Sequence, residues 1–135
     1  MTPSTATVLM KDDGTGAISM NMNVAAFHEK ALELGWSCSP KTGTDKYGTI
    51  TVGLNQFNFL GDGLYRVDIG DPAFSTEKGL RVGDNIETMM RLYGAPDSQD
   101  VLPDNGGVAY SYALSATFGM SVTVKAGKVH DLLFG

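Results

Sequence analysis

Apolar and polar side chains alternate most regularly near the C-terminus of the chain. Apolar residues occupy every second position at Phe118, Met120, Val122 and Val124. This period of two predicts a strand with one buried face. The same pattern predicts further strands at residues 49–54, 57–59, 64–69, 110–114 and 129–134. Glycine-containing turns at 61–63 and 125–128 join neighbouring strands, so we expect those strands to be antiparallel.

A helical period appears in two segments, the first of which follows Asn23. Apolar residues recur there at three- and four-residue spacing, at Val24, Phe27, Ala31 and Leu34. That spacing places them on one face of a helix. Asn23 is a good N-cap residue and Gly35 suits a helix end, so we predict a helix between them.

The second helical segment is more strongly marked. Its apolar stripe consists of Ile86, Met89, Met90 and Tyr93. Asp84 with Glu87 three residues later has the spacing of a capping box, which predicts the start of the helix. Gly94 suits a left-handed closing position, and Pro96 cannot continue the helix.

Turn, helix, loop and antiparallel meander therefore occur twice, in the internal repeats 17–70 and 79–135. Each helix has one apolar stripe and each strand one apolar face, so the two kinds of element can bury these surfaces against one another. We predict a single α+β domain over residues 1–135. Its helices pack on one face of a shared antiparallel sheet.

Turn-forming residues mark two other segments, at residues 11–16 and 97–107. Turn formers fill residues 11–16, so we expect an opening hairpin between strands at 7–10 and 17–20. Residues 97–107 are polar and rich in turn formers, and we expect an exposed loop there.

Composition narrows the classes of partner and cofactor. The net charge of −5 and the pI near 4.8 argue against a nucleic-acid partner, because such a surface needs clustered Lys and Arg. No apolar run reaches the roughly eighteen residues of a spanning helix, so we expect no membrane span. Cys38 is the only cysteine, which excludes an internal disulfide and a cysteine-rich zinc site. We expect no cofactor and no bound metal.

The candidate catalytic side chains are His28, His130 and Cys38. His130 adjoins Asp131, but neighbours in a strand point to opposite faces, so this pair is not expected to act together. No cysteine-hydrolase motif surrounds Cys38, and a lone thiol more often packs as a small apolar group. We therefore expect surface histidines, a packed thiol and no enzymatic activity.

One element of the second repeat resembles a known family. The residues are Leu80-Arg81-Val82-Gly83-Asp84, then Ile86, then Tyr93-Gly94-Ala95-Pro96. They are similar to the turn, helix and Gly-x-Pro element of the β-lactamase-inhibitor-protein-like fold, which small exported bacterial lipoprotein domains also carry. The chain lacks a cysteine pair and has no proline after Gly35, and in both respects it departs from that pattern. The resemblance implies an exported, non-enzymatic protein that binds other proteins.

We therefore expect a protein-binding or inhibitor-like module of an exported or cell-envelope bacterial protein whose leader has been removed. A cytoplasmic location is the alternative. The candidate partner-binding residues are Trp36, Tyr47, Arg66 and Asp100. They are aromatic or charged side chains that lie near predicted loops or on the outward face of the sheet, where protein contacts form. The identity of the protein partner and the oligomeric state are left open.

Two other functions remain open from the sequence. The first is a small-molecule or peptide-binding domain with a pocket between the helices and the sheet. Its lining would be Phe27, Trp36, Tyr110 and Tyr112. The second is a hydrolase that uses Cys38 and one of the two histidines, which requires these side chains to come within hydrogen-bonding reach.

Overall fold

The computed structural model describes residues 7–103 and 106–135. Within them the chain forms two helices, α1 (Val24–Glu33) and α2 (Ile86–Tyr93). The strands are β1 (Thr7–Val8), β2 (Thr42–Gly43), β3 (Tyr47–Val52), β4 (Asn55–Leu60), β5 (Gly63–Ile69), β6 (Phe74–Ser75), β7 (Ser98–Leu102), β8 (Gly107–Ala113), β9 (Gly119–Lys125) and β10 (Lys128–Phe134). Neither helix is long and apolar enough to cross a lipid bilayer. The fold is mixed α+β.

Eight strands form one antiparallel sheet in the order β2-β3-β4-β5-β10-β9-β8-β7. Along the chain α1 is followed by β2–β5, and α2 by β7–β10. The two groups of four strands meet where β5 pairs with β10. The paired residues there are Ile69 with Leu132, Asp68 with Leu133 and Val67 with Phe134. We call this short pairing the seam of the sheet.

One row of paired residues crosses the seam on the face that the helices cover. This inner row consists of Phe57, Val67, Phe134, Met120 and Tyr112 on β4, β5, β10, β9 and β8, each paired with the next. Directly paired side chains point to the same face of a sheet. α1 contacts the row through Phe27, whose ring centroid lies 4.8 Å from that of Phe57. α2 contacts it through Tyr93, 5.5 Å from Tyr112, so both helices cover the same face.

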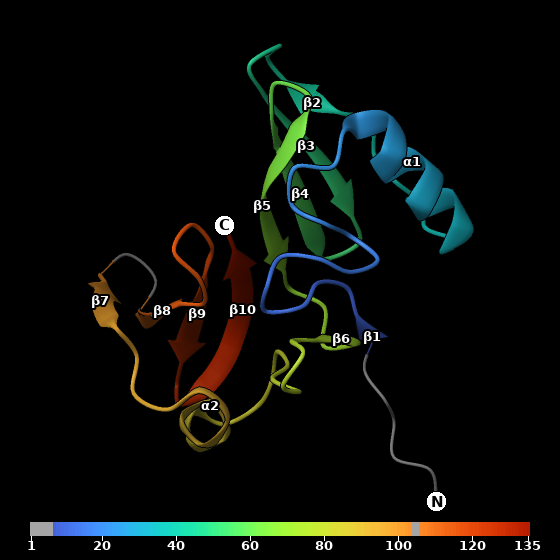
Figure 1. The fold of residues 1–135 in the computed structure, drawn as a ribbon. Helices are drawn as coiled ribbons and strands as arrows, with labels where there is room; N and C mark the ends of the chain where they lie inside the picture. The colour runs from blue at the N-terminus through green and yellow to red at the C-terminus, as the bar shows by residue number, and fades with distance from the viewer. Residues whose placement is uncertain (1–6, 104–105) are drawn as a thin grey trace, which may run out of the picture.

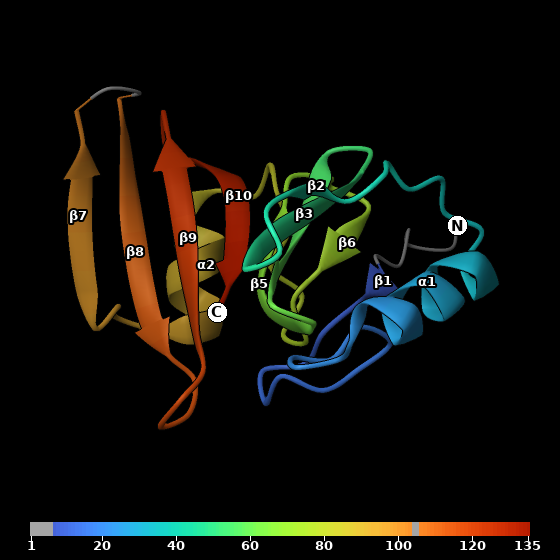
Figure 2. The same ribbon diagram turned by 90° about the horizontal axis from the view of Figure 1, so that it is seen from above.

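The sheet bends at the seam. Figure 1 shows the two groups of strands meeting at an angle, with α1 and α2 on the outer side of the bend. In the view from above, α2 lies behind β9 and β10 (Figure 2). The opposite face lies inside the bend, and neither described helix covers it. We call it the open face, and its side chains include Gln56, Arg66, Asp68, Asp131, Leu133, Ser121, Ser111 and Ser98.

An aromatic cluster fills the space beneath α1. Phe27 has no exposed surface, and its ring lies 5.6 Å from Phe59 and 6.2 Å from Trp36. Trp36 in turn lies 5.6 Å from Phe57. Burial of large aromatic side chains is the strongest packing contribution that a domain of this size makes. The cluster therefore anchors α1 on β4.

Several local predictions are confirmed. The side chain of Asn23 caps α1, because its Oδ1 accepts a hydrogen bond of 2.7 Å from the backbone N–H of Ala26. On β9 the predicted alternation holds, with Met120, Val122 and Val124 buried and the residues between them partly exposed.

The predicted opening hairpin is wrong in its return strand. Residues 17–20 form no strand, and β1 pairs in parallel with β6 instead. A hydrogen bond of 2.9 Å from Ile18 N–H to the Leu9 carbonyl draws the two arms together in a compact loop. At Gly16 the backbone has φ of +150°, and a Cβ would lie 2.6 Å from the Leu9 carbonyl oxygen. This close approach needs glycine, and it turns the chain out of a regular ladder.

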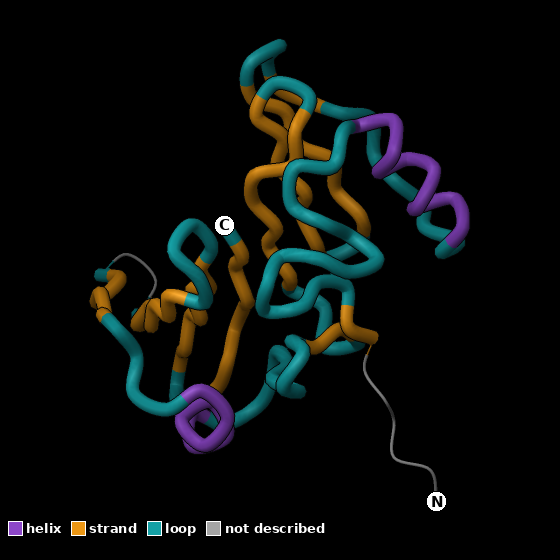
Figure 3. Tube along the Cα trace, viewed as in Figure 1, coloured by secondary structure: helices purple, strands orange, loops and turns teal. Residues whose placement is uncertain are grey.

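The segment after this loop lies along the start of β5. Asn21 N–H donates to the Leu64 carbonyl at 2.7 Å, and Leu64 N–H donates to the Met22 carbonyl at 2.9 Å. Figure 3 shows the extent of loop between β1 and α1. The hydrogen bonds hold this irregular segment against the sheet without adding a strand to it.

The predicted cap of α2 at Asp84 is also wrong. Asn85 precedes the helix without a side-chain cap, and Asp84 Oδ2 instead accepts a hydrogen bond of 2.9 Å from Arg81 N–H. Ile86 N–H donates to the Gly127 carbonyl at 2.9 Å, in the turn between β9 and β10. This tertiary contact sets the start of the helix and overrides the local capping preference. Gly94 ends the helix, as the sequence predicts, but with φ of +75° and ψ of −157° it adopts an extended positive-φ conformation that favours glycine and not the left-handed helical one.

The predicted loop at 97–107 contains β7, which pairs with β8 along its whole length. Four of its five residues are exposed, and Val101 keeps 73% of its surface in solvent. A strand without a buried face has no need to alternate apolar and polar residues. The pattern used to find the other strands is therefore absent here.

We expect Phe27→Ala to lower the free energy of unfolding by about 3–5 kcal/mol, because it leaves a cavity in the aromatic cluster. Leu32→Ala on the same helix is the matched control, since Leu32 keeps 82% of its surface exposed. The control should change stability by less than about 0.5 kcal/mol. Urea unfolding followed by circular dichroism measures both, and equal losses would contradict this account of how α1 is held.

Candidate functional site

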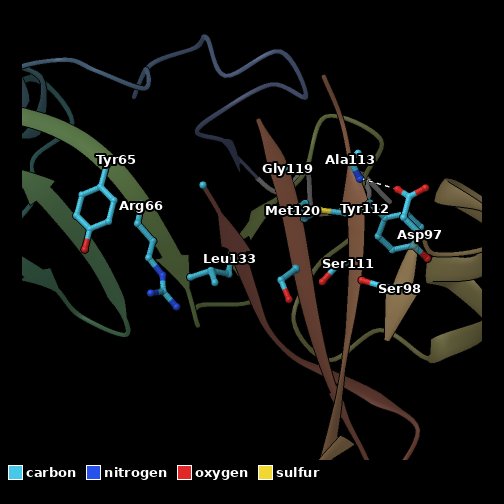
Figure 4. A pocket seen from close by; sticks show the side chains of 12 residues that line it. Tyr65, Arg66, Asp97, Ser98, Ser111, Tyr112, Ala113, Gly119, Met120 and Leu133 are labelled. Carbon is cyan, nitrogen blue, oxygen red and sulfur yellow. Dashed lines mark hydrogen bonds between the residues drawn. The ribbon is translucent and has the colours of Figure 1, made fainter. Parts of the chain in front are cut away.

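The open face carries a cavity of about 550 Å³. It extends from β5 across β10, β9 and β8 to β7, as the close view in Figure 4 shows. Its lining residues are Tyr65, Arg66, Asp97, Ser98, Ser111, Tyr112, Ala113, Gly119, Met120, Ser121, Leu133 and Gly135. This volume is typical of sites that hold a small ligand or the side chains of a partner. We call it the central cavity.

The floor of the central cavity is a row of small side chains. Ser98 pairs with Ser111, Ser111 with Ser121, and Ser121 with Leu133. Each pair places its side chains next to one another on the open face, and Figure 4 shows Leu133, Ser111 and Ser98 along this row. Serine side chains fill little space above the sheet, and this leaves the hollow. Leu133, half-buried, is the apolar side chain in the floor.

A β-bulge builds the wall at β5. Asn58 pairs with Arg66 but Phe59 pairs with Leu64, so Tyr65 is an extra residue on β5. The bulge lets Tyr65 line the cavity beside Arg66, whereas regular alternation would put it on the inner face with Val67. Leu64 takes the buried position on the inner face instead, because the bulge changes the alternation at this point.

The opposite wall lies at the start of β7. Asp97 Oδ2 accepts a hydrogen bond of 2.7 Å from the backbone N–H of Ala113, which ties this wall to β8. On the inner face below, the Tyr112 hydroxyl donates to the Gly94 carbonyl at 2.9 Å and so anchors the end of α2. Burial raises the pKa of Tyr112, which keeps the hydroxyl protonated as a donor.

A second cavity of about 440 Å³ lies next along β5 and β10. Asp68, His130 and Asp131 line it together with Gln56 and Val82, among others. The Asp68 carboxyl is hydrogen-bonded to that of Asp131, and burial, this hydrogen bond and the neighbouring negative charge raise the pKa of Asp68 to about 7. Arg66 has a smaller, opposite effect. Asp68 therefore keeps its proton at mildly acidic pH, next to Asp131 across the seam.

The expectation that His130 and Asp131 face opposite sides is wrong. Val129 pairs with Val124 and Asp131 with Thr123, which makes His130 the extra residue of a second bulge. Because of the bulge, both side chains line the second cavity. Period-two reasoning could not predict this, since a bulge leaves no mark in the hydrophobic pattern.

The four predicted partner-binding residues lie in different places. Trp36 belongs to the aromatic cluster on the helix-covered face, away from the open face. Tyr47 is half-exposed at the start of β3, and its ring lies 6.2 Å from that of Tyr65. Arg66 is exposed and lines the central cavity. Asp100 is exposed on β7, two residues along the same face from Ser98.

Three of the four therefore lie on or beside the open face. Sequence reasoning missed Leu133, Ser98 and Asp97, which complete the central cavity. Leu133 carried no signal of exposure, because it lies in an apolar run. Ser98 and Asp97 lay in a segment read as loop.

The candidate catalytic side chains are separate from the central cavity. His28 is exposed on α1, and Cys38 is half-buried in the segment between α1 and β2. Burial raises the pKa of the Cys38 thiol, so the nucleophilic thiolate is disfavoured. Within 7–103 and 106–135, no group of three or more His, Cys, Asp or Glu could hold a metal ion.

No protein-family model and no curated protein sequence matches the chain. Two solved structures have a similar fold. One is a DUF4309 family protein (YjgB) from Bacillus subtilis, with a TM-score of 0.55, 12% identity, and coverage of 83% of this chain and 76% of that chain. The other is the uncharacterized protein YfeY from Escherichia coli, with a TM-score of 0.56, 14% identity, and coverage of 96% and 99%. Both are bacterial, and at these identities the likeness concerns the fold alone.

We expect the Asp68–Asp131 pair to make stability depend on pH. The folded protein keeps the proton of Asp68 up to about pH 7, whereas the unfolded chain loses it near the ordinary value of 3.8. The free energy of unfolding therefore falls, through this group, as pH rises from about 4 to about 7. Asp68→Asn removes that loss. After a discount for solvent screening, the variant should be more stable than the wild type by about 1 kcal/mol at about pH 8.

Near pH 4 this advantage should largely disappear, because both states then bind the proton. The exposed Asp45→Asn is the control, and its stability difference from the wild type should be the same at both pH values. Urea unfolding at the two pH values measures these differences. An Asp68→Asn difference that does not change with pH would contradict the raised pKa of Asp68.

Proposed function

We propose that the chain is a non-enzymatic module of an exported bacterial protein, and that it binds another protein through the open face. The observation that carries this proposal is the central cavity, which hollows the concave side of the sheet across five strands. Two bacterial proteins have a similar fold, which supports the bacterial origin. The resemblance to the β-lactamase-inhibitor-protein-like fold is what supports export.

The chemistry of the wall supports a protein partner. Tyr and Arg are enriched among residues that dominate protein interfaces, and here Tyr65 and Arg66 stand together at one side of the cavity. Tyr47 extends the same wall through its contact with Tyr65. The floor of small residues leaves room for side chains of the partner, and this is the usual arrangement of an anchor pocket.

The element order also supports the two-repeat interpretation. Each helix precedes four strands, and the two groups meet end strand to end strand at the seam. We propose that residues 17–70 and 79–135 are two copies of one unit. In this arrangement the open face combines strands from both copies, and the central cavity takes one wall from the first copy and the floor from the second.

The alternative pocket between the helices and the sheet has less support. Its predicted lining is Phe27, Trp36, Tyr110 and Tyr112. The rings of Phe27 and Trp36 contact each other and Phe57 at centroid distances of 4.8–6.2 Å. These side chains fill the space beneath α1. A hydrolase that uses Cys38 is likewise disfavoured, because the raised pKa of the thiol opposes nucleophilic attack at neutral pH.

A photo-crosslinking amino acid placed at Ser111 tests the proposed function in cells that carry the gene. Ser111 lies in the floor of the central cavity, so we expect ultraviolet light to produce a protein adduct of one defined mass. Ser121→Trp fills the neighbouring position, and it should abolish the adduct with little change in stability because its side chain faces the open side.

Two controls make this test decisive. The crosslinker at the exposed Glu29 on α1 should give no such adduct. Thr51→Trp, on β3 at the other end of the same face, should leave the adduct at Ser111 unchanged. Equal adducts at Ser111 and Glu29, or none at Ser111, would overturn the proposal.

A further inference from the structure

Arg66 supplies the positive charge of the central cavity. Among the side chains of the twelve lining residues only those of Arg66 and Asp97 are charged, and the Asp97 carboxylate already accepts a hydrogen bond from Ala113 N–H. In the described part of the chain the one ion pair within 4.0 Å joins Lys30 and Glu33, so Arg66 has no such partner there. An unpaired guanidinium at the edge of a cavity favours an anionic group, because Arg binds carboxylates through two parallel hydrogen bonds.

Asp68 does not neutralise this arginine below neutral pH. It lies two residues from Arg66 on the same face of β5, and its raised pKa keeps it largely protonated in the pair with Asp131.

The apolar contact of the cavity lies at a defined place relative to Arg66. Leu133 pairs directly with Asp68, and this makes Arg66 its diagonal neighbour across the seam. Diagonal side chains on one face of a sheet lie roughly 7–8 Å apart. In an extended peptide the side chains of residues i and i+2 share one face and lie roughly 7 Å apart. The two spacings match.

We propose that the central cavity binds an extended segment of a protein partner that carries a large apolar residue and an acidic residue two positions apart. The apolar side chain packs on Leu133 beside Ser121, and the carboxylate binds Arg66. The serine hydroxyls of the floor provide hydrogen bonds to the backbone of the segment. This inference rests on the proposed function and specifies its partner.

Short blocked peptides test the inference with the full chain. The probes are acetyl-Phe-Gly-Glu-amide and acetyl-Glu-Gly-Phe-amide, because the segment fits the spacing in either direction. The control peptides carry glutamine in place of glutamate and therefore lack only the negative charge. Two-dimensional NMR of the labelled protein follows each titration to millimolar concentration. We expect saturable shifts at the amides of Ser111, Ser121 and Leu133, and affinity about five-fold higher for the better glutamate peptide than for its glutamine counterpart.

Arg66→Gln should lower the affinity for the glutamate peptide to that of the glutamine peptide and leave the latter unchanged. Arg91→Gln, an exposed arginine on α2 at the other face of the sheet, is the matched control and should change neither affinity. Raised salt should also weaken the preference for glutamate. The absence of saturable shifts at these amides, or equal affinity for the charged and uncharged peptides, would overturn the inference.

The two proposals fail in distinguishable ways. If the Ser111 adduct forms and the peptides show no preference for glutamate, the face binds a protein of other chemistry, and only this inference is wrong. If the glutamate peptide binds through Arg66 and no protein adduct forms, the cavity recognises the predicted chemistry but protein binding is wrong as the function. The crosslinking experiment therefore tests protein binding, and the peptide titrations test the chemistry of the segment.

Discussion

The packing of both helices depends on the inner row that crosses the seam. Phe57 and Tyr112 lie at its two ends, and each is in ring contact with a different helix. Between them the two groups of strands are joined by three residue pairs of β5 and β10. Apolar burial along this row holds together two units that share few backbone hydrogen bonds. The bend of the sheet, and therefore the hollow of the open face, depends on how these few residues pack.

The Asp68–Asp131 pair makes the stability of the seam depend on pH. Two carboxyl groups from different groups of strands meet on the open side of the same short pairing. Apolar side chains stabilise the inner side of the seam at every pH. The contribution of the outer side to stability depends on protonation, because two neighbouring carboxylates repel each other when both are ionised. One short junction thus combines a constant stabilising contribution with a variable one.

Burial determines which strands could be predicted from the sequence. Strands with one buried face, such as β9, alternate because their inner residues are excluded from water, and the sequence analysis located them. β7 has no buried face, so nothing in its sequence distinguished it from a loop. The bulges at Tyr65 and His130 depend on how two strands pair, which is a tertiary property. Arg66 could be predicted as a binding residue because its charge and its outward position on a strand are visible in the sequence. Leu133 and the complete cavity could not, because they depend on how the strands pair.

On β9, core formation and the lining of the open face are carried by alternate residues. On β9 the residues at even positions build the core, while Ser121 and Thr123 at odd positions contribute almost nothing to it. A mutation at an odd position can therefore reshape the cavity without loss of stability. Such a scaffold is open to divergence in evolution, because its open face can change while the buried half of the same strands is conserved. Proteins built in this way would retain a common fold after their sequences, and the partners they bind, have become unrecognisably different.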